Sequence, residues 1–490
     1  MNLKALFLFF GACLIGVALF GQTGYSPAST LSPLPPSVQK SIDDKLTRDL
    51  QGVELSGKAK KMLNGLYQSR YDHFMEEVEA GYLLDFPALN ELCANILEEL
   101  RTNNPGIPLP VRVFVSRDPS PNARCLGDGT LLIHMGLIRR MHNESQLAFV
   151  ISHELAHYVL DHVNQKLISY SIKATDRVLE KEVNRMMTES DDPFTTLLSY
   201  LEGEAYQTHR HSRDRETEAD SLGLKLLLNT SYAPEGAIGC MKVLQEVDSP
   251  KYHLQVDYQR LLGNLEHPFD ENWLIYTPSN NFVYGTNGGD LDWELDSLAT
   301  HPDCDLRLAN LRRQLANRPI DETKSTSVSP LFEQLETAID LEWLLGYFHH
   351  MAYGRTLYLA FQLTEIYPDE PALYSIIGQT MYEIYQSKKA HDLGFKIEFP
   401  NPLREPAYNE FLNFARSLRL SDWADYCLQF MMAQNPAFQK DEVFMYTTLL
   451  CASIQKDTEI FDTLRQAYYD QFAGGEYNPD VEALNKMVHE

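Results

Sequence analysis

Two histidines and a glutamate stand together in an apolar stretch, as His153, Glu154 and His157. Residues four apart share one face of an α-helix, so both imidazoles can reach a single metal ion. Glu154 is next to the pair and can act on a water molecule instead of binding the metal. This HExxH arrangement predicts zinc-dependent hydrolysis of peptide bonds, with two ligands and a general base. Because the motif is short, a chance match on an amphipathic helix is the alternative.

A later acidic stretch can supply the third zinc ligand, which the first motif lacks. Catalytic zinc takes three protein ligands and keeps one open position. Glu216 and Asp220 are four residues apart in a polar segment of helical composition. Glu216 can be the third ligand, and Asp220 can accept a hydrogen bond from the far nitrogen of a ligand imidazole. Glu218 faces another side and is the weaker candidate. A solvated charged helix is the alternative, but it is disfavoured when both motifs occur in one chain.

The segments before the first motif must position it. Residues 111–115 and 130–134 are rich in β-branched and apolar side chains and predict two strands. Asn143 predicts the start of the zinc-binding helix, which we expect to continue through Asp161 and His162. The second strand directly precedes this region, so an extended substrate could pair with a free edge there. The residues concerned are Thr130, Leu131, Leu132 and Ile133. An ordinary interior strand is the alternative.

Length and charge limit the possible functions. A chain of 490 residues predicts two or more domains. The net charge of -26 argues against a nucleic-acid partner, because phosphate binding needs a basic surface. Six cysteines follow residue 21 and none forms a CxxC pair, which argues against a cysteine zinc site. Disulfides are permitted in an exported chain, but their pairing cannot be deduced from the sequence.

The N-terminus has the pattern of a secretory signal. Lys4 precedes an apolar run at 5–20, and polar, turn-forming residues follow. The run is shorter than the roughly 20 residues that a spanning helix needs. We predict a signal peptide at 1–21 and a flexible spacer at 22–37. The mature chain has no later spanning segment and is expected in a periplasm, with peripheral membrane contact left open. An uncleaved anchor is the alternative.

The C-terminal part is helical by its apolar periodicity. Pro368, Pro402 and Pro436 are 34 residues apart, which is the period of tetratricopeptide repeats. Stacked helix pairs of this type form a groove for partners, and an irregular helical bundle is the alternative. The predicted fold is mainly α (α+β): a metallopeptidase domain with a small β-sheet at 38–318, a linker at 319–330, and a tetratricopeptide-like α-solenoid at 331–490.

Residues 111–247 resemble the HtpX/Ste-type family of zinc metallopeptidases. The matching segments are 121–123, 129–133 with Gly136 and Leu137, 152–157, and 212–220. The resemblance implies a zincin-type fold in which His153, His157 and Glu216 bind Zn²⁺ and Glu154 is catalytic. The multiple membrane spans of some members are missing here. With its helical tail, the chain resembles the soluble, exported, BepA-like members of the family.

The resemblance also extends to Thr300, His301 and Pro302, followed by Arg307. A histidine near the zinc could stabilise the oxyanion of the reaction, or occupy the open metal position and silence the enzyme, or only pack its loop. The polar segment between His157 and Glu216 is long for the family and is a candidate lid or plug.

The resemblance implies an endopeptidase for protein quality control in the cell envelope. Its substrates would be unfolded or misassembled proteins, and its tail would bind envelope assembly machinery. The alternative function is a chaperone or assembly adaptor whose peptidase is mostly latched.

Overall fold

The computed structural model describes residues 25–173, 209–275 and 304–489, except 248, 253, 264, 266–268, 402, 403, 456 and 457. The predicted signal peptide, His301 and most of the candidate lid lie outside these residues. The chain divides into two compact units. We call the unit made of Pro27–Leu254 and Ser279–Ala352 the N-terminal unit. The C-terminal unit contains the described residues of Gln255–Pro278 and Tyr353–Glu490, together with Tyr25 and Ser26.

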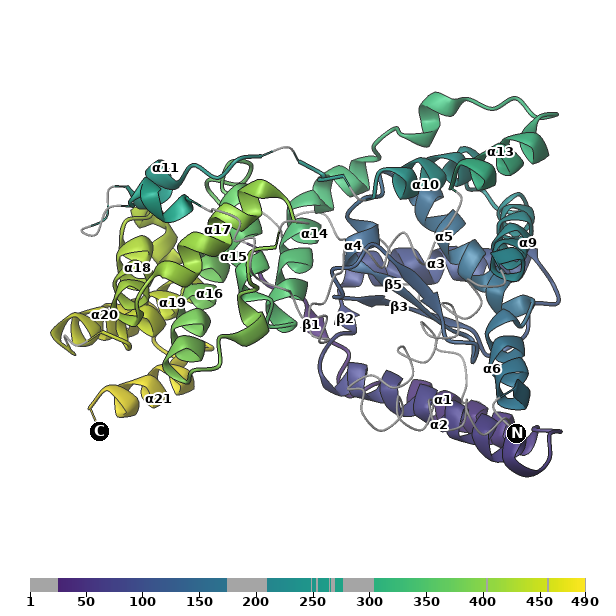
Figure 1. Cartoon of the computed structure of the whole chain (residues 1–490), viewed down its shortest axis with the longest axis horizontal. Coiled ribbons are helices and arrows are strands. Elements are labelled where there is room, and N and C mark those ends of the chain that lie inside the picture. Colours follow the sequence, from purple (N-terminus) through teal and green to yellow (C-terminus); the bar gives the residue numbers. More distant parts are fainter. Residues whose placement is uncertain are drawn as a thin grey trace, which may run out of the picture. The chain divides into compact units, whose positions relative to one another are not determined.

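A three-stranded sheet lies at the centre of the N-terminal unit (Figure 1). Its strands are β3 (Arg112–Ser116), β4 (Ala123–Cys125) and β5 (Thr130–His134), in the order β3-β5-β4. β5 is parallel to β3 and antiparallel to β4. Both predicted strands are therefore confirmed. The predicted free edge at Thr130, Leu131, Leu132 and Ile133 is wrong, because β4 pairs with the side of β5 that β3 leaves open, and every residue of β5 is buried.

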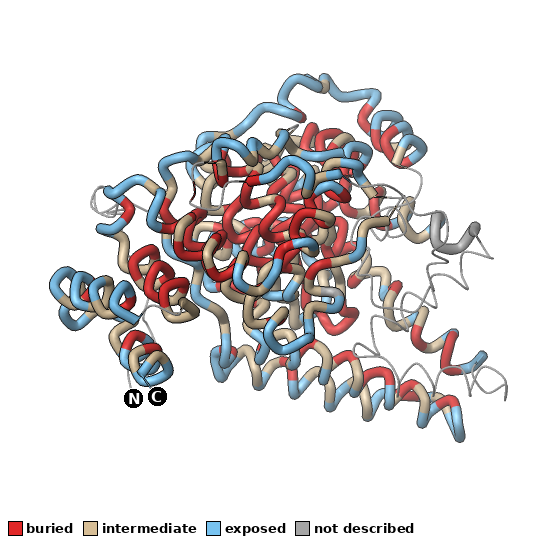
Figure 2. The backbone as a smooth tube through the Cα atoms, turned by 60° about the vertical axis from the view of Figure 1, so that its left-hand side comes forward, coloured by how far each residue is buried: buried red, intermediate tan, exposed pale blue. Residues whose placement is uncertain are grey.

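Helices surround this sheet, and most have one buried and one exposed side (Figure 2). The helix that carries the HExxH motif, α5 (Glu144–Val159), is buried along most of its length because it packs against α3, α9, α10 and the sheet. A short two-stranded sheet, β1 (Ser29–Thr30) with β2 (Leu84–Asp85), lies beside β3. The remaining helical elements of this unit are α1 (Pro36–Gln51), α2 (Gly57–Glu79), α3 (Pro87–Asn103), α4 (Met135–Ile138), α6 (His162–Lys173), α9 (His209–Leu227), α10 (Glu235–Gln245), α13 (Cys304–Leu315), η2 (Glu322–Ser325) and α14 (Pro330–His349).

Helix α5 begins as predicted but ends earlier. The Asn143 side chain accepts a hydrogen bond from the backbone N–H of Gln146 at 3.1 Å, which confirms the predicted cap. The expected continuation through Asp161 and His162 is wrong. Asp161 has a φ of 56°, a left-handed conformation that ends a helix. The Asn164 side chain donates to the Asp161 carboxylate at 2.6 Å and supports this turn. As a result, α6 begins at His162 in a new direction.

Two predicted boundaries differ from the structure. The described part of the predicted spacer contains β1, the buried side chain of Leu34 and the start of α1, so it is part of the fold. Helix α14 belongs to the N-terminal unit, although the sequence assigned it to the tail from residue 331. Two buried ion pairs hold α14 there. Arg139 donates to Asp340 at 2.7 Å, and Arg117 donates to Glu342 at 2.8 Å.

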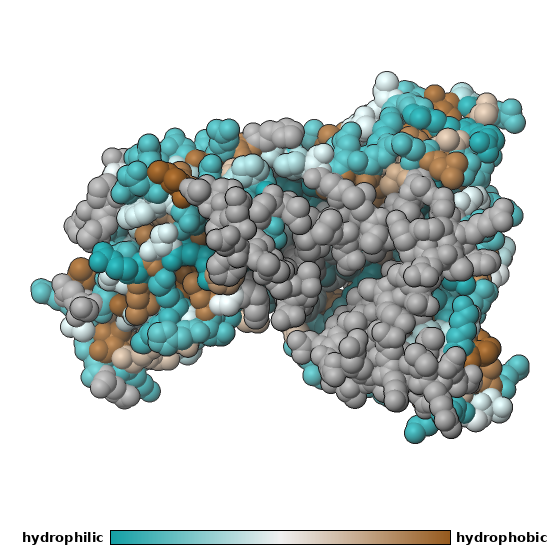
Figure 3. Space-filling view, viewed as in Figure 1, coloured by the Kyte–Doolittle hydropathy of each residue, from teal (hydrophilic) through white to brown (hydrophobic). Residues whose placement is uncertain are grey.

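The C-terminal unit is entirely helical in its described elements, which confirms the mainly α fold class; the tetratricopeptide arrangement stays a prediction. On the face of this unit seen in Figure 3, small hydrophobic areas lie among hydrophilic ones. The elements are α11 (Tyr258–Leu262), η1 (Glu271–Leu274), α15 (Tyr353–Leu363), α16 (Pro371–Lys389), η3 (Gly394–Lys396), α17 (Pro406–Ser417), α18 (Leu420–Met432), η4 (Pro436–Lys440), α19 (Glu442–Ala452), α20 (Thr458–Gln471) and α21 (Asn478–His489).

The segment 255–275 also packs in the C-terminal unit, so the predicted domain 38–318 is not continuous. The Asn413 side chain on α17 donates hydrogen bonds to the backbone carbonyls of Trp273 at 2.9 Å and Ile275 at 3.0 Å. Phe269 also lies against Phe414 of α17, with their ring centroids 5.3 Å apart. These contacts explain why the segment groups with helices that lie far from it in the sequence.

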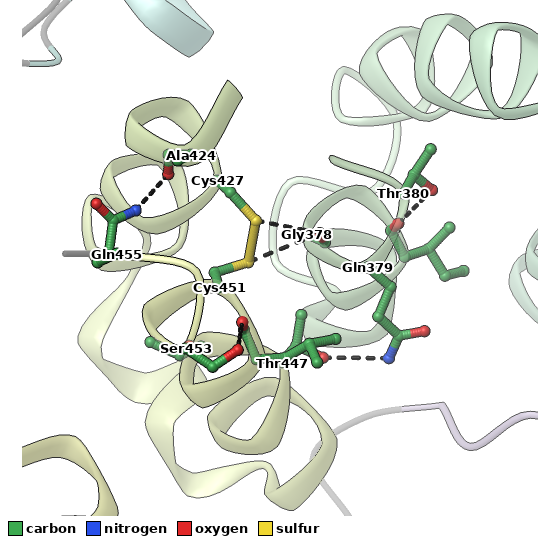
Figure 4. Close-up of a disulfide and its surroundings, with 12 residues drawn as sticks. Gly378, Gln379, Thr380, Ala424, Cys427, Thr447, Cys451, Ser453 and Gln455 are labelled. Atoms are coloured by element: carbon green, nitrogen blue, oxygen red, sulfur yellow. Dashed lines mark hydrogen bonds between the residues drawn. A yellow bond between two sulfur atoms is a disulfide. The ribbon is translucent and has the colours of Figure 1, made fainter. Parts of the chain in front are cut away.

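A disulfide joins two helices of the C-terminal unit (Figure 4). Cys427 on α18 is bonded to Cys451 on α19, and both sulfur atoms lie against the carbonyl of Gly378 on α16. The bond therefore lies where three helices meet. Among the helices that the structure describes, none combines the length and apolar character needed to cross a membrane.

The attachment of α14 can be tested at Asp340, which is fully buried. Its carboxylate also accepts hydrogen bonds from Lys251 at 3.1 Å and Tyr252 at 2.8 Å. We expect Asp340→Asn to lower the free energy of unfolding by about 3–5 kcal/mol, because it leaves Arg139 buried without its counter-charge. Urea unfolding measures the change. Glu336→Gln, one turn earlier and 50% exposed, is the matched control and should cost about 1 kcal/mol or less.

Candidate metal centre

Two helices bring the three predicted zinc ligands together. Helix α5 presents His153 and His157 with their Nε2 atoms 3.1 Å apart. Helix α9 presents Glu216, whose Oε2 is 3.5 Å from His153 Nε2 and whose Oε1 is 3.4 Å from His157 Nε2. One ligand atom from each residue lies within 4.8 Å of the others. The spacing of four residues on α5 therefore places both imidazoles on one face, as the sequence predicted.

The spacing of these atoms fits zinc. Tetrahedral zinc with bonds of about 2.0–2.1 Å to nitrogen and oxygen separates its ligand atoms by about 3.3 Å. The Nε2 atoms of His153 and His157 are 3.1 Å apart, and they lie 3.5 and 3.4 Å from the two different oxygens of the Glu216 carboxylate. Two neutral imidazoles and one carboxylate are also a common ligand set for catalytic zinc. The residues would hold zinc with little rearrangement.

The close approach of α5 and α9 depends on a glycine. A Cβ atom at Gly223 of α9 would lie 3.1 Å from the backbone nitrogen and Cα of His153 and 3.2 Å from the carbonyl of Ser152. Such distances are too short for ordinary packing. Because Gly223 and the small, fully buried Ala219 lie on this contact, the carboxylates on the same helix can reach the imidazoles on α5.

Asp220 occupies the position that the sequence predicted for it. Its Oδ1 lies 3.0 Å from Nδ1 of His153, on the side of the ring away from the ligand atom. This contact places the ring proton on Nδ1 and leaves Nε2 for a metal. Burial opposes a charged ring, but the hydrogen bonds to Asp220 and Glu216 raise the pKa of His153 to about 10. The surroundings thus stabilise positive charge at the point where a cation would bind.

Arg307 completes the centre; the resemblance included this residue without predicting a role for it. It extends from α13 and is only 3% exposed. Its Nε and Nη2 each donate to Asp220 at 2.7 Å, and its Nη1 lies 3.1 Å from Glu216 Oε2. Burial would raise the pKa of the Glu216 carboxyl, but Arg307 and the two histidines hold it well below its usual value. The match of Arg307 to the family's Thr-His-Pro segment was the signal that could have found it, but its carboxylate partners are distant in the sequence, so the pattern did not reveal this role.

Glu154 is buried beside the ligands, with 5% of its surface exposed. A small cavity lies next to it, lined by His153, by Ala123 of β4 and by apolar side chains of α4, α5 and α10. A carboxylate beside the metal ligands and at the wall of a cavity is suitably placed for a general base.

Two other predicted sites do not join this group. Thr130 is buried in β5, where its hydroxyl accepts a hydrogen bond from Arg112 at 2.8 Å and donates to Asp128 at 3.1 Å. It therefore stabilises the sheet. Leu131, Leu132 and Ile133 are core residues of the same strand. His301 lies outside the described residues.

Comparison with known proteins shows which proteins this chain resembles. Residues 86–315 match the family described as Peptidase family M48. Metalloprotease YcaL of Escherichia coli (strain K12) is 27% identical over 167 residues, which are 34% of this chain and 62% of that protein. Mitochondrial metalloendopeptidase OMA1 of Schizosaccharomyces pombe is 25% identical over 177 residues, which are 35% and 48% of the two chains.

Beta-barrel assembly-enhancing protease of Escherichia coli (strain K12) is 22% identical over 167 residues, which are 34% of either chain. This chain covers less than two thirds of the length of each of these relatives. The matches confirm the predicted resemblance to zinc metallopeptidases of this type, including the BepA-like members.

Arg307→Met tests the charge balance of the centre. We expect it to lower the free energy of unfolding of the metal-free protein by about 3–5 kcal/mol at neutral pH, because two buried carboxylates lose their counter-charge. Urea unfolding measures the loss. Arg313→Met on the exposed side of the same helix is the control, with an expected change of about 0.5 kcal/mol or less.

The loss of unfolding free energy caused by Arg307→Met should become smaller as the pH falls. In the wild-type protein the pKa values of Asp220 and Glu216 are lowered from 3.8 and 4.5, so their stabilising contribution is present above about pH 5. It is lost as the pH falls through the lowered values. The difference between Arg307→Met and wild type should therefore shrink on acidification, and a difference that grows at low pH would contradict this account.

Proposed function

We propose that this chain, whose residues 86–315 match Peptidase family M48, is a zinc-dependent endopeptidase of the cell envelope. The convergence of His153, His157 and Glu216 at separations that suit zinc supports the proposal most directly. The buried carboxylate of Glu154 beside them supplies the general base that peptide hydrolysis requires.

The mechanism divides the work among these residues. Zinc, when bound, polarises the scissile carbonyl and lowers the pKa of a water molecule. His153, His157 and Glu216 hold the metal, and Asp220 fixes the orientation of His153. The Glu154 carboxylate takes a proton from the attacking water and delivers it to the leaving amine nitrogen. Arg307 keeps the Glu216 and Asp220 carboxylates ionised for these tasks.

The outer edge of β4 suits an extended substrate. No strand in the described part of the chain pairs with this edge. Between β4 and β5, the N–H of Leu126 donates to the carbonyl of Thr130 at 3.0 Å, and the N–H of His134 donates to the carbonyl of Asn122 at 3.1 Å. Hydrogen-bonded positions alternate in an antiparallel pair, so the peptide groups of Ala123 and Cys125 point away from β5. The N–H of Ala123 donates to Oδ1 of Asn122 at 2.8 Å, so a substrate strand could bond to the Cys125 N–H, with its backbone beside the cavity at Glu154.

Recognition through the backbone supports a role in protein quality control, because it accepts many sequences and requires an unfolded segment. The Cys427–Cys451 disulfide is consistent with an oxidising compartment such as a periplasm. One relative is named a beta-barrel assembly-enhancing protease. We therefore propose that the substrates are unfolded or misassembled envelope proteins and that the helical C-terminal unit binds assembly partners.

Glu154→Gln tests the catalytic assignment. We expect the variant to retain wild-type zinc content and to cleave an unfolded protein about 10²–10⁴-fold more slowly, because it loses the proton acceptor. Glu216→Gln, its companion, should lose zinc as well as activity. Zinc analysis and proteolysis assays of the purified proteins give both readouts. If Glu154→Gln rescued a deletion strain as well as wild type, the adaptor function would replace the peptidase as the main role.

Cys125→Pro tests the β4 edge. Proline removes a backbone N–H that points away from β5, so the sheet should tolerate it. We expect a several-fold rise in KM for an unfolded protein substrate, with zinc content unchanged, and steady-state kinetics measures it. Cys125→Ala controls for the lost thiol and should keep the wild-type KM. Equal KM values for the proline and alanine variants would show that substrate does not bond at this N–H.

A further inference from the structure

The two histidine ligands have different partners behind them. His153 has the buried Asp220 carboxylate at its Nδ1. His157 has another imidazole instead: its Nδ1 lies 3.0 Å from Nδ1 of His162, and Nε2 of His162 lies 3.3 Å from Oε2 of Glu218. We propose that His162 and Glu218 form a hydrogen-bonded chain that positions His157 for zinc, an inference that rests on the proposed zinc peptidase function.

The direction of each hydrogen bond follows from the metal. A zinc-bound imidazole uses the lone pair of one nitrogen and carries its proton on the other. His157 presents Nε2 to the ligand group, so its Nδ1–H donates. His162 Nδ1 must then accept, which places the His162 proton on Nε2. That N–H donates to the Glu218 carboxylate, which can only accept. Each ring nitrogen of His157 and His162 then has one consistent role as metal ligand, donor or acceptor.

The early end of α5 creates this contact. If the helix continued, residue 162 would be five positions past His157 and about 140° away around the helix axis. The left-handed Asp161 instead starts α6 at His162 and turns its ring toward His157. The two ring centroids are 5.0 Å apart at an interplanar angle of 72°, and the His162 side chain is 6% exposed. A buried imidazole in this position has a defined orientation.

The carboxylates behind the two histidine ligands differ in their exposure to water. Asp220 is buried and bonded to Arg307 through two 2.7 Å hydrogen bonds. Glu218 has 63% of its side chain exposed, so water competes for its oxygens. We therefore infer that His157 is oriented mainly by the buried imidazole of His162, and that Glu218 strengthens this orientation to a smaller degree.

A purely structural role is the competing explanation, in which the pair only links α6 to α9. Zinc affinity separates the two, because a link between helices changes folding stability without needing the hydrogen bond to His157. Four full-length variants make the comparison. His162→Leu removes the acceptor, and His162→Asn retains one close to the position of Nδ1. Glu218→Ala removes the outer carboxylate, and Asp214→Ala removes an exposed carboxylate one turn earlier on α9.

The measurements are the zinc dissociation constant by chelator competition, the visible absorption spectrum of the Co²⁺-substituted protein, and urea unfolding of the metal-free protein. We expect His162→Leu to raise the dissociation constant about 10–100-fold and to alter the Co²⁺ spectrum. His162→Asn should recover most of this affinity. Glu218→Ala should show a smaller loss, and Asp214→Ala none.

A wild-type zinc affinity in His162→Leu would overturn the proposal. An equal loss of zinc affinity in His162→Asn and His162→Leu would also overturn it, because it would show that His162 acts by packing and not as a hydrogen-bond acceptor. If His162→Leu does not fold, Glu218→Ala decides the question. A zinc affinity equal to that of Asp214→Ala would contradict the proposed hydrogen-bonded chain. A wild-type protein that binds no zinc would instead refute the proposed function, so the two failures are distinguishable.

Discussion

The close packing of α5 against α9 is the contact on which the metal centre depends. The HExxH motif on α5 supplies two ligands and the base, but the third ligand comes from a helix more than 50 residues later. Gly223 allows the backbones to approach, so that Glu216 and Asp220 reach opposite nitrogens of His153. The same helix carries Glu218 toward His162. One helix contact therefore arranges both the metal ligands and the groups behind them.

Burying this much charge requires compensation, and the fold provides it from a third helix. Arg307 of α13 bridges the two carboxylates of α9, and a metal ion would add the remaining positive charge. A similar arrangement holds α14 in the N-terminal unit, where Arg117 and Arg139 meet buried carboxylates. Buried ion pairs cost desolvation energy but define one arrangement of the helices. In both places they join segments that are remote in the sequence.

The parts of the site that depend on local sequence could be predicted. Periodicity and capping located α5, and a spacing of four residues placed His153 with His157 and Glu216 with Asp220. The parts that depend on tertiary pairing could not. The three-residue strand β4 is hidden among turn-forming residues, so β5 seemed to have an edge. The role of Arg307 depends on carboxylates that are distant in the sequence, and the end of α5 depends on the left-handed turn at Asp161. Helix α14 resembled a tail helix because its buried charges find their partners only in the folded chain.

Zinc K-edge X-ray absorption spectroscopy of the purified full-length protein tests the central claim most directly, because it reports the ligands without relying on activity. The account predicts one shell of nitrogen and oxygen ligands at about 2.0–2.1 Å, with the outer-shell scattering of two imidazoles from His153 and His157. A sulfur shell at about 2.3 Å, a single imidazole, or a protein without zinc would contradict it.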